Sequence, residues 1–210
     1  MKVETLLRRL GDGKLAGDGG VRVKGITHDS RQVVAGNVFA AIPGEHVHGV
    51  KFVDQAAQAG AAAVLSDRQR PKRINLPWIK VGKPRPAMAR AALILAGNPQ
   101  KKLRLVAVTG TNGKSTTAHL SSTVLNAAGL KTAFLGTLGA QLPDGTERAC
   151  ERTTPEATDL AVLLREAVKA GAETVAMEVS SHALSQDRVS GLKFEVAVWT
   201  NLTRDHLDYH

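Results

Sequence analysis

The most constraining feature of this sequence is an apolar run that breaks into a glycine loop ending in Gly-Lys-Ser, residues 106–117. Glycines let consecutive backbone amides turn toward phosphate oxygens, a lysine reaches the β- and γ-phosphates, and a serine hydroxyl can bind Mg²⁺. Val108 stands where the widespread G-x-x-x-x-G-K-[ST] pattern has its first glycine, so the match is to the shorter form Gly110–Ser115. An ordinary strand–turn–helix corner is the alternative. The order of strand, glycine loop and helix favours a phosphate-binding loop.

Strand and helix patterns alternate regularly in the second half of the chain. Strands are expected at residues 103–108, 132–135, 174–179 and 195–199, and helices at 115–128 and from Thr154, as cap, and Pro155 onward. Such alternation predicts a mostly parallel sheet covered on both faces. Ligands bind outside the carboxyl ends of the strands in sheets of this kind. We therefore expect the polar turns at 109–117, 136–137, 180–182 and 200–206 to meet at one crevice.

The first half of the chain predicts a smaller α/β domain. Helices are expected at residues 3–10, 52–59 and 84–98, and strands at 21–26, 38–42, 62–65 and 78–81. A polar junction that contains a proline, Asn98–Lys102, separates the two halves. We therefore predict two domains, residues 1–98 and 99–210.

The positive charge of the chain favours anionic partners, and its composition argues against two kinds of them, nucleic acids and membranes. The 210 residues carry a net charge of +9, but only 3% are aromatic and the Lys and Arg residues are scattered, so a nucleic-acid partner is not expected. No segment approaches the ~20 apolar residues of a membrane span, and the N-terminus has no apolar signal core. The single cysteine, Cys150, suits a reducing compartment. We expect a cytoplasmic monomer without a membrane partner.

Polar residues at the expected strand ends are candidates for a site. Glu178 lies inside an apolar run, and a buried carboxylate needs a cation or hydrogen-bond donors. A metal near the phosphates is one interpretation, and a glutamate that faces solvent or a lysine is the other. His206 and His182 could bind a metal or phosphate, or be structural. Four further residues have a plain structural interpretation beside a functional one: Thr153 and Thr154 as helix caps, Gln186 and Arg188 as members of a solvated loop.

The sequence resembles the Mur ligases of peptidoglycan synthesis, in particular the MurE branch. The resemblance rests on four blocks: Thr109–Thr117, Thr153–Glu156, Glu178–Leu184 and Asn201–His210. Upstream, Asp29–Arg31 and Gly36–Ala41 are similar to the uridine-binding domain of that branch. The resemblance implies an ATP-dependent ligase that adds the third amino acid, diaminopimelate or lysine, to UDP-N-acetylmuramoyl-L-Ala-D-Glu. In that family ATP phosphorylates the substrate carboxylate, and the incoming amine attacks the acyl phosphate.

The resemblance also implies the site residues. ATP would be held by Thr111, Asn112, Gly113, Lys114, Ser115, Thr116 and Thr117, with Lys114 on the phosphates and Ser115 on Mg²⁺. Glu178 and His206 would complete the catalytic and metal site. The uridine end of the substrate would contact His28, Ser30, Glu45, His46 and Val47, and the muramoyl-peptide end Thr153, Thr154, Ser180, Gln186 and Arg188. Phosphoryl transfer asks mainly for positioning and charge neutralisation, which these groups can provide.

Two positions depart from the family pattern, and the sequence ends before the family pattern does. Arg152 stands where the family usually has asparagine, and His48 stands before Gly49 where it usually has aspartate. The chain stops at His210, inside a motif that the family continues, so we expect an inactive amino-terminal fragment that lacks the carbamylated lysine and the amino-acid-binding domain. The alternatives are a ligase like folylpolyglutamate synthase, and a module that binds nucleotide or UDP-sugar without catalysis.

Overall fold

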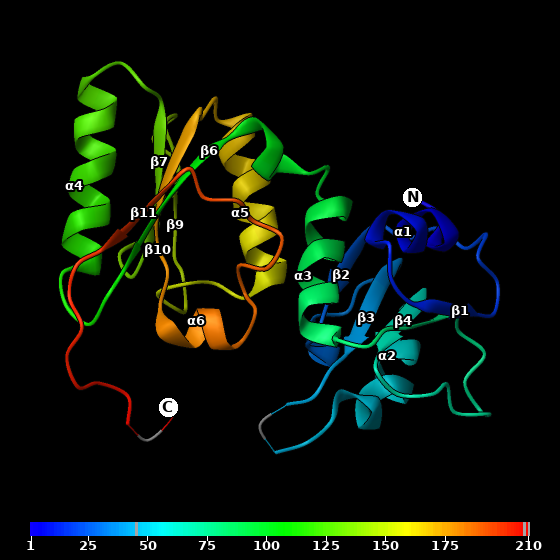
Figure 1. Ribbon diagram of the computed structural model, residues 1–210. Helices are drawn as coiled ribbons and strands as arrows, with labels where there is room; N and C mark the ends of the chain where they lie inside the picture. The colour runs from blue at the N-terminus through cyan, green and yellow to red at the C-terminus, as the bar shows by residue number, and fades with distance from the viewer. Residues whose placement is uncertain (45, 208, 210) are drawn as a thin grey trace. The chain divides into compact units, whose positions relative to one another are not determined.

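The computed structural model describes residues 1–44, 46–207 and 209, so Glu45 of the predicted uridine site lies outside the described residues. The chain divides into two compact units, Met1–Gly97 and Asn98–His210 (Figure 1). Gly97 and Asn98 have positive φ angles of 89° and 56°, and Pro99 follows them. The chain therefore cannot continue the preceding helix across this point.

The first unit is built on a five-stranded sheet in the order β1-β5-β4-β3-β2. Its strands are β1 Lys14–Ala16, β2 Gly25–Thr27, β3 Asn37–Ala41, β4 Ala63–Ser66 and β5 Trp78–Lys80. Its helices are α1 Val3–Leu10, α2 Val53–Gln58 and α3 Pro84–Leu95, with 3₁₀ turns η1 Ser30–Gln32 and η2 Gly49–Phe52. All neighbouring strands are parallel except β1, which runs antiparallel to β5.

The core of the first unit lies on both faces of this sheet. Phe39, Val64 and Trp78 pack with Val53 and Ala56 of α2 on one face. Helix α3 contacts β2, β3 and β4 and packs against α1. Since both faces are covered, the central strands β3 and β4 are apolar almost throughout, as parallel strands usually are.

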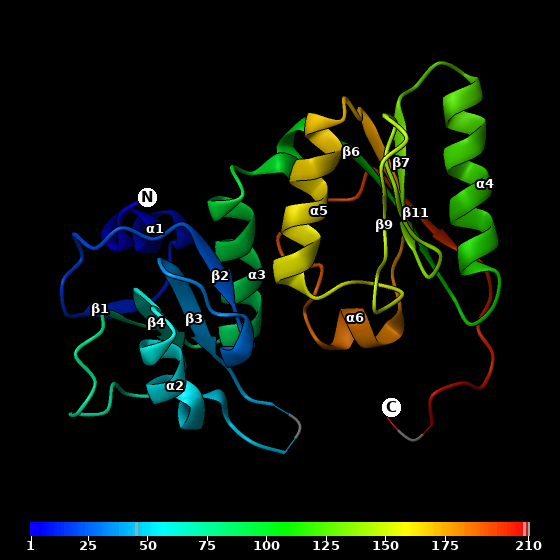
Figure 2. The same cartoon turned by 180° about the vertical axis from the view of Figure 1, so that it is seen from behind.

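The second unit is built on a six-stranded sheet in the order β11-β6-β10-β7-β8-β9. Its strands are β6 Arg104–Thr109, β7 Thr132–Gly136, β8 Gly139–Gln141, β9 Glu147–Arg148, β10 Thr174–Glu178 and β11 Val196–Trp199. Its helices are α4 Lys114–Ala127, α5 Ala157–Lys169 and α6 Ser181–Ser185, preceded by a 3₁₀ turn, η3 Pro99–Lys102. Figures 1 and 2 show α4 on one face of the sheet and α5 on the other. The predicted α/β class with parallel-dominated sheets is thus confirmed.

Two details of the second unit differ from the sequence expectation. Strands β8 and β9 form an antiparallel hairpin beside β7 that the helix and strand patterns did not indicate. Helix α5 begins at Ala157, with Glu156 at its cap position, so Thr154 and Pro155 precede the helix instead of opening it. Among the described residues, no helix combines the length and the apolar character that a membrane span requires.

Candidate active site

The predicted phosphate-binding loop lies at the carboxyl end of β6 and leads into α4. Gly110 and Gly113 have φ angles of 133° and 83°, in the region that favours glycine. A Cβ on Gly110 would lie 2.9 Å from the backbone oxygen of Asn201, so the close approach also requires glycine. Lys114 is the first residue of α4, and its Nζ donates to the carbonyl oxygens of Gly110 and Thr111 at 2.7 and 2.8 Å. The loop therefore joins a lysine charge to the unsatisfied amides of a helix N-terminus.

Residues that follow β11 fasten this loop. The Asn112 N–H donates to Asn201 Oδ1 at 3.0 Å, and Asn201 Nδ2 donates to the Asn112 carbonyl at 3.0 Å. The Thr111 N–H donates to the Asn201 carbonyl at 3.1 Å, and Thr200 Oγ1 donates to the Asn112 carbonyl at 2.7 Å. The amides of Thr111 and Asn112 thus shape the loop, which leaves the first turn of α4 to supply donors to a phosphate.

Glu178 ends β10, directly beside the end of β6, and is only 1% exposed. Its carboxylate accepts from Ser115 Oγ at 2.9 Å, from the Thr137 N–H at 2.8 Å and from Thr137 Oγ1 at 3.3 Å. Glu178 therefore does not face solvent, no lysine forms an ion pair with it among the described residues, and the structure brings it together with the serine of the glycine loop. Gly136 leaves room for this carboxylate, since a Cβ there would collide with Glu178 Oε1.

Thr153 and Thr154 lie at the same edge of the sheet, but neither caps a helix. Thr153 Oγ1 lies within hydrogen-bond distance of Thr137 Oγ1, at 3.0 Å, which links it to Glu178. Thr154 is fully buried, and its hydroxyl donates to the Glu178 carbonyl and accepts from the Ser180 N–H, both at 3.0 Å. The predicted capping role of Thr154 is wrong, because its hydroxyl bonds to the backbone of Glu178 and Ser180, the residues before and after Val179, and not to a helix N-terminus. Ser180 is the residue that caps, through the Ala183 N–H at 3.2 Å.

Arg188 is buried in the same region, with 6% of its surface exposed. Its Nη1 donates to the Thr154 carbonyl at 2.9 Å, and its Nη2 donates to Gln186 Oε1 at 2.6 Å. Its Nε lies 3.1 Å from Glu156 Oε1, which Arg152 Nη1 also approaches to 3.2 Å. Arg188 is thus a fixed guanidinium at the carboxyl edge of the sheet, and the interpretation of Arg188 as part of a solvated loop is wrong, whereas Gln186 is half-buried.

His206 lies against His182, with the ring centroids 4.5 Å apart and the planes at 82°. Its Nε2 is 3.5 Å from Asp205 Oδ2. Among the described residues there is no group of three or more His, Cys, Asp or Glu side chains that could hold a metal ion. The two oxygens of Ser115 and Glu178 nevertheless fit Mg²⁺, which is usually held by one or two protein ligands together with substrate phosphates. The metal roles of Ser115, Glu178 and His206 stay predictions.

The predicted uridine-binding residues follow β2 and β3, whose carboxyl ends lie side by side in the first unit. Ser30 is buried, and its hydroxyl donates to Gln55 Oε1 at 2.9 Å. His28 Nδ1 is buried and meets no partner among the described residues. His46 and Val47 are exposed on the loop after β3. The placement is compatible with one ligand at this edge, and the assignment stays a prediction.

His48, which departs from the family pattern, keeps the function of a cap. Its Nδ1 accepts from the Val50 N–H at 3.1 Å at the start of η2, as an aspartate oxygen would. Its Nε2 lies 2.9 Å from Asp67 Oδ1. Because Nδ1 accepts a hydrogen bond, Nε2 carries the proton and donates it to Asp67. His48 thereby ties the loop of His46 and Val47 to the end of β4.

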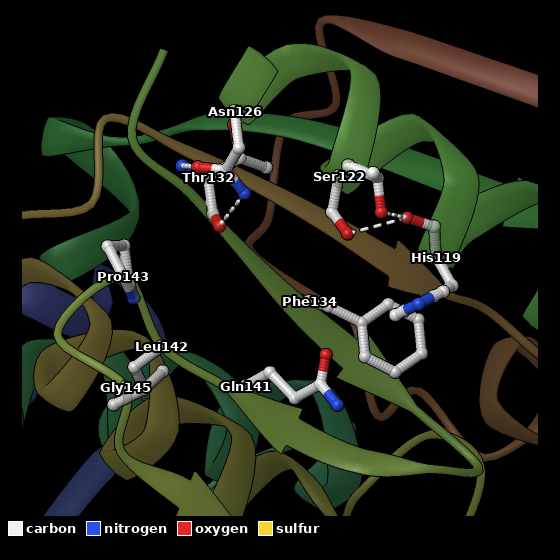
Figure 3. Close-up of a pocket in the computed structure, with 10 residues that line it drawn as sticks. His119, Ser122, Asn126, Thr132, Phe134, Gln141, Leu142, Pro143 and Gly145 are labelled. Carbon is white, nitrogen blue, oxygen red and sulfur yellow. Dashed lines mark hydrogen bonds between the residues drawn. The ribbon is translucent and has the colours of Figure 1, made fainter. Parts of the chain in front are cut away.

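A separate pocket of about 270 Å³ lies between α4 and the turn of the β8–β9 hairpin. Figure 3 shows Asn126 and Thr132 joined by a hydrogen bond at one end, and His119 and Phe134 at the other. The His119 and Phe134 rings meet edge to face with centroids 5.4 Å apart. None of the predicted site residues lines this pocket.

Residues without a predicted role also take part in the site, among them Thr137, Glu156 and Asn201. Thr137 and Asn201 belong to polar turns at predicted strand ends, and Asn201 and Glu156 also lie in the blocks that carry the family resemblance. Thr137 meets Glu178 across 41 residues of sequence, and Asn201 meets Asn112 across 89. The available signal for Thr137 and Asn201 was a polar side chain shortly after an apolar strand, and Glu156 had no comparable signal.

Two family models and several known relatives match this chain. The model described as "Mur ligase middle domain" matches residues 108–210, and the one described as "Mur ligase family, catalytic domain" matches residues 22–96. A protein of Deinococcus radiodurans named UDP-N-acetylmuramyl-tripeptide synthetase is 47% identical over 90% of this chain. A Geobacter metallireducens protein named UDP-N-acetylmuramoyl-L-alanyl-D-glutamate–2,6-diaminopimelate ligase is 43% identical over all of it. The chain spans 39% and 41% of the lengths of these two relatives.

A solved structure shares the fold. It is described as a UDP-N-acetylmuramoyl-L-alanyl-D-glutamate–2,6-diaminopimelate ligase, and it superposes with a TM-score of 0.81 at 29% identity. The match covers 100% of this chain and 42% of that one. Together the two family models cover both units, and the relatives align along nearly the whole chain. The chain belongs to the Mur ligase family.

Proposed function

We propose that this chain forms part of an ATP-dependent ligase that adds diaminopimelate or lysine to UDP-N-acetylmuramoyl-L-alanyl-D-glutamate. The names of the two bacterial relatives support this reaction. ATP transfers its γ-phosphoryl group to a carboxylate of the substrate, and the amine of the incoming amino acid then displaces the phosphate to form an amide. The cytoplasmic location and the monomeric state belong to the same proposal, and size-exclusion chromatography tests the second.

The observation that carries this proposal is the contact between the glycine loop and Glu178. Ser115 Oγ lies 2.9 Å from Glu178 Oε2, and Ser115 directly follows Lys114 in the sequence. A hydroxyl, a carboxylate and phosphate oxygens together make a suitable ligand set for Mg²⁺. Mg²⁺ and Lys114 would neutralise the charge that develops on the transferred phosphoryl group. Thr116 and Thr117 continue the ATP-binding segment in the first turn of α4, and His206 is assigned to the phosphates and metal on the family resemblance alone.

The substrate side of the proposal uses two groups of residues, one in each unit. In the second unit, Thr153, Thr154, Ser180, Gln186 and Arg188 gather at the sheet edge that carries Glu178. In the first unit, His28, Ser30, His46 and Val47 follow adjacent strand ends. We assign the muramoyl-peptide end of the substrate to the first group and its uridine end to the second.

The test is amide formation by the protein as its own gene encodes it, including any residues after His210. Lys114→Ala should lower ATP-dependent formation of the tripeptide product by about 100-fold or more, because it removes a charge that stabilises the transition state. Lys169→Ala is the matched control, since Lys169 lies exposed in the last turn of α5. Equal activity of the Lys114 variant and the wild type would contradict the assigned role.

Competing substrates separate the alternatives. UDP-N-acetylmuramoyl-L-alanyl-D-glutamate should compete for the site and a folate should not; the reverse result would favour a ligase like folylpolyglutamate synthase. Tight binding of the UDP-substrate without ATP turnover would favour a binding module.

A further inference from the structure

The loop that carries His46 and Val47 is held in shape by its own backbone. The chain leaves β3 and returns at Gly49, whose N–H donates to the Ile42 carbonyl at 2.8 Å. Nearer the tip, the Gly44 N–H donates to the Val47 carbonyl at 3.1 Å. Each of these bonds joins two positions of the same turn, so by themselves they do not direct the exposed side chains of His46 and Val47 relative to the sheet.

The side chain of His48 links this loop to the sheet. Its Nε2 donates to Asp67 Oδ1 at 2.9 Å, and the two side chains are only 20% and 25% exposed. Among the described residues, no other side chain of residues 42–48 makes a hydrogen bond. The Val50 N–H occupies Nδ1, so the imidazole ring is held at both nitrogens.

Asp67 lies next to a rigid part of the first unit, the end of β4. The preceding residue, Ser66, is fully buried, and its hydroxyl donates to the Ala41 carbonyl of β3 at 2.6 Å. Ser66 and Ala41 are also register partners where β3 and β4 pair. An ion pair between two mobile, exposed side chains contributes little, but here one partner follows a fixed strand end and both are sheltered. Asp67 can therefore hold His48 in one place.

We propose that His48 and Asp67 form a positioning pair for the uridine end of the substrate. Neither residue needs to touch the ligand. Their bond holds the loop so that His46 and Val47 are in place before the ligand binds, and a loop that needs no ordering binds with higher affinity. This inference rests on the proposed function, which assigns His46 and Val47 to the uridine. An ionised aspartate at position 48, the usual residue of the family, could cap η2 but has no proton to donate to Asp67.

Two substitutions of His48 separate its two hydrogen bonds. In His48→Asn, Oδ1 takes the place of Nδ1 and keeps the cap, but the side chain is too short to reach Asp67. In His48→Gln, the amide nitrogen takes the place of Nε2 and keeps the donor to Asp67, but the cap on the Val50 N–H is lost. The two variants therefore distinguish a positioning role from a purely structural one, because loss of a cap lowers stability.

The test uses the protein as its own gene encodes it. His48→Asn should raise the KM for UDP-N-acetylmuramoyl-L-alanyl-D-glutamate, and the Kd for UDP, by about threefold to tenfold, the range expected when one hydrogen bond is lost. His48→Gln should keep both constants within twofold, although its unfolding midpoint should be lower than that of the wild type. The kcat and the KM for ATP should stay within twofold in both variants. A KM that rises in His48→Gln and not in His48→Asn would assign the effect to the cap and overturn the proposal.

A double-mutant cycle tests whether the two residues act as one unit. Asp67→Ala should raise the same KM as much as His48→Asn does, and the double variant should raise it no further, because both substitutions remove the same bond. Asp54→Ala is the matched control: it removes an aspartate of the same unit that pairs with Arg73 at 2.7 Å and leaves the loop untouched. Additive effects, or an equal effect of Asp54→Ala, would overturn the proposal. A wild-type protein that binds neither UDP nor the full substrate would instead count against the proposed function, so the two failures are distinguishable.

Discussion

Gly136 shows how closely a single residue is adapted to the site. It lies in β7 at the position nearest Glu178, where a Cβ would collide with Glu178 Oε1 and come within 2.7 Å of the Phe134 ring. Both neighbours are buried, so neither can move freely. The absence of a side chain at Gly136 is therefore what allows a charged carboxylate to lie inside the sheet edge.

Gly136→Ala should destabilise the protein by about 1–3 kcal/mol, the usual cost of forcing extra volume into a packed region. Denaturant unfolding measures this difference. Gly82→Ala is the control, because no atom lies within 4 Å of a Cβ built at Gly82, and its stability should change by less than about 0.5 kcal/mol. Equal stability of the Gly136 variant and the wild type would contradict this prediction, because it would mean that the Glu178 side chain can move away from the added methyl group without cost.

Asp29 provides a pH-dependent prediction at the same scale. Its carboxylate accepts from Arg31 Nη2 at 2.7 Å, and this hydrogen bond is the main cause that holds the pKa of Asp29 below its ordinary value. Arg31→Ala should raise that pKa, though only in part because the Arg31 N–H still donates to Asp29 Oδ1 at 2.9 Å. An NMR titration of the Asp29 carboxyl carbon measures the shift.

The sign of the effect on stability follows from the lowered pKa. A carboxyl whose pKa is depressed in the folded state stabilises the protein fully above its unfolded pKa, about 3.9, and loses this contribution as the pH falls through the folded value. The wild type should therefore lose stability below about pH 4 more steeply than Arg31→Ala. An Asp29 pKa that is the same in both proteins would contradict the assigned cause.

The sequence indicated which side chains lie at the strand ends better than it indicated their contacts. The glycine loop is local, so its order of residues was sufficient, and the apolar run around Glu178 indicated a buried carboxylate. Asn201 could not be assigned, because its partner Asn112 is 89 residues away. Thr154 was misassigned for a similar reason: a threonine before a proline suits a helix cap, but its actual partners are the Glu178 carbonyl at the end of β10 and the amide of Ser180, which caps α6.

At the scale of elements, the β8–β9 hairpin is the main structure that the sequence did not predict. Its turn contains Pro143-Asp144-Gly145, a combination typical of tight turns, and the Thr146 N–H donates to Asp144 Oδ1 at 2.9 Å. The strands that flank it have three and two residues, too few for an alternating pattern to stand out. The turn residues could therefore have indicated this hairpin, whereas the hydrophobic pattern could not.

Gly139 is the position on which this hairpin most depends. Its φ is 100°, and a Cβ there would lie 2.5 Å from the Arg148 carbonyl oxygen of the opposing strand. Gly139→Ala should therefore separate β8 from β9, at a cost of about 1–3 kcal/mol for the strained backbone. Hydrogen exchange should become faster at the amides of residues 139–148 and stay unchanged in β10. Protection of the hairpin amides equal to that of the wild type would show that the backbone relaxes without breaking the pairing.

At the scale of the whole molecule, each unit has the features of an independently folding domain. The first unit has its own apolar cluster around Phe39, Val64 and Trp78, and the second has one around Val108 and Phe134. The sequence located the division at 98/99 from the polar, proline-containing junction, and the two compact units divide at Gly97 and Asn98. The roles of the two units as substrate-binding and ATP-binding domains stay proposals.

The two tryptophans of the chain allow the units to be followed separately. Trp78 is 1% exposed in the first unit, with its Nε1 donating to the Arg68 carbonyl at 2.8 Å, whereas Trp199 is 65% exposed in β11 of the second. Trp199→Phe leaves Trp78 as the single reporter, so its emission should be blue-shifted in the native state and should move to longer wavelength in one cooperative step with denaturant.

Residues 1–97 expressed alone should show the same native emission and an unfolding midpoint close to that of the Trp199→Phe protein. The physical reason is that the sheet order β1-β5-β4-β3-β2 and its covering helices are all supplied by this segment, so its core does not need residues of the second unit. Small single domains of this size usually unfold in two states, which makes the two midpoints comparable. Solvent-like emission of the isolated segment without denaturant, or a transition without cooperativity, would show that the first unit depends on the second for its fold.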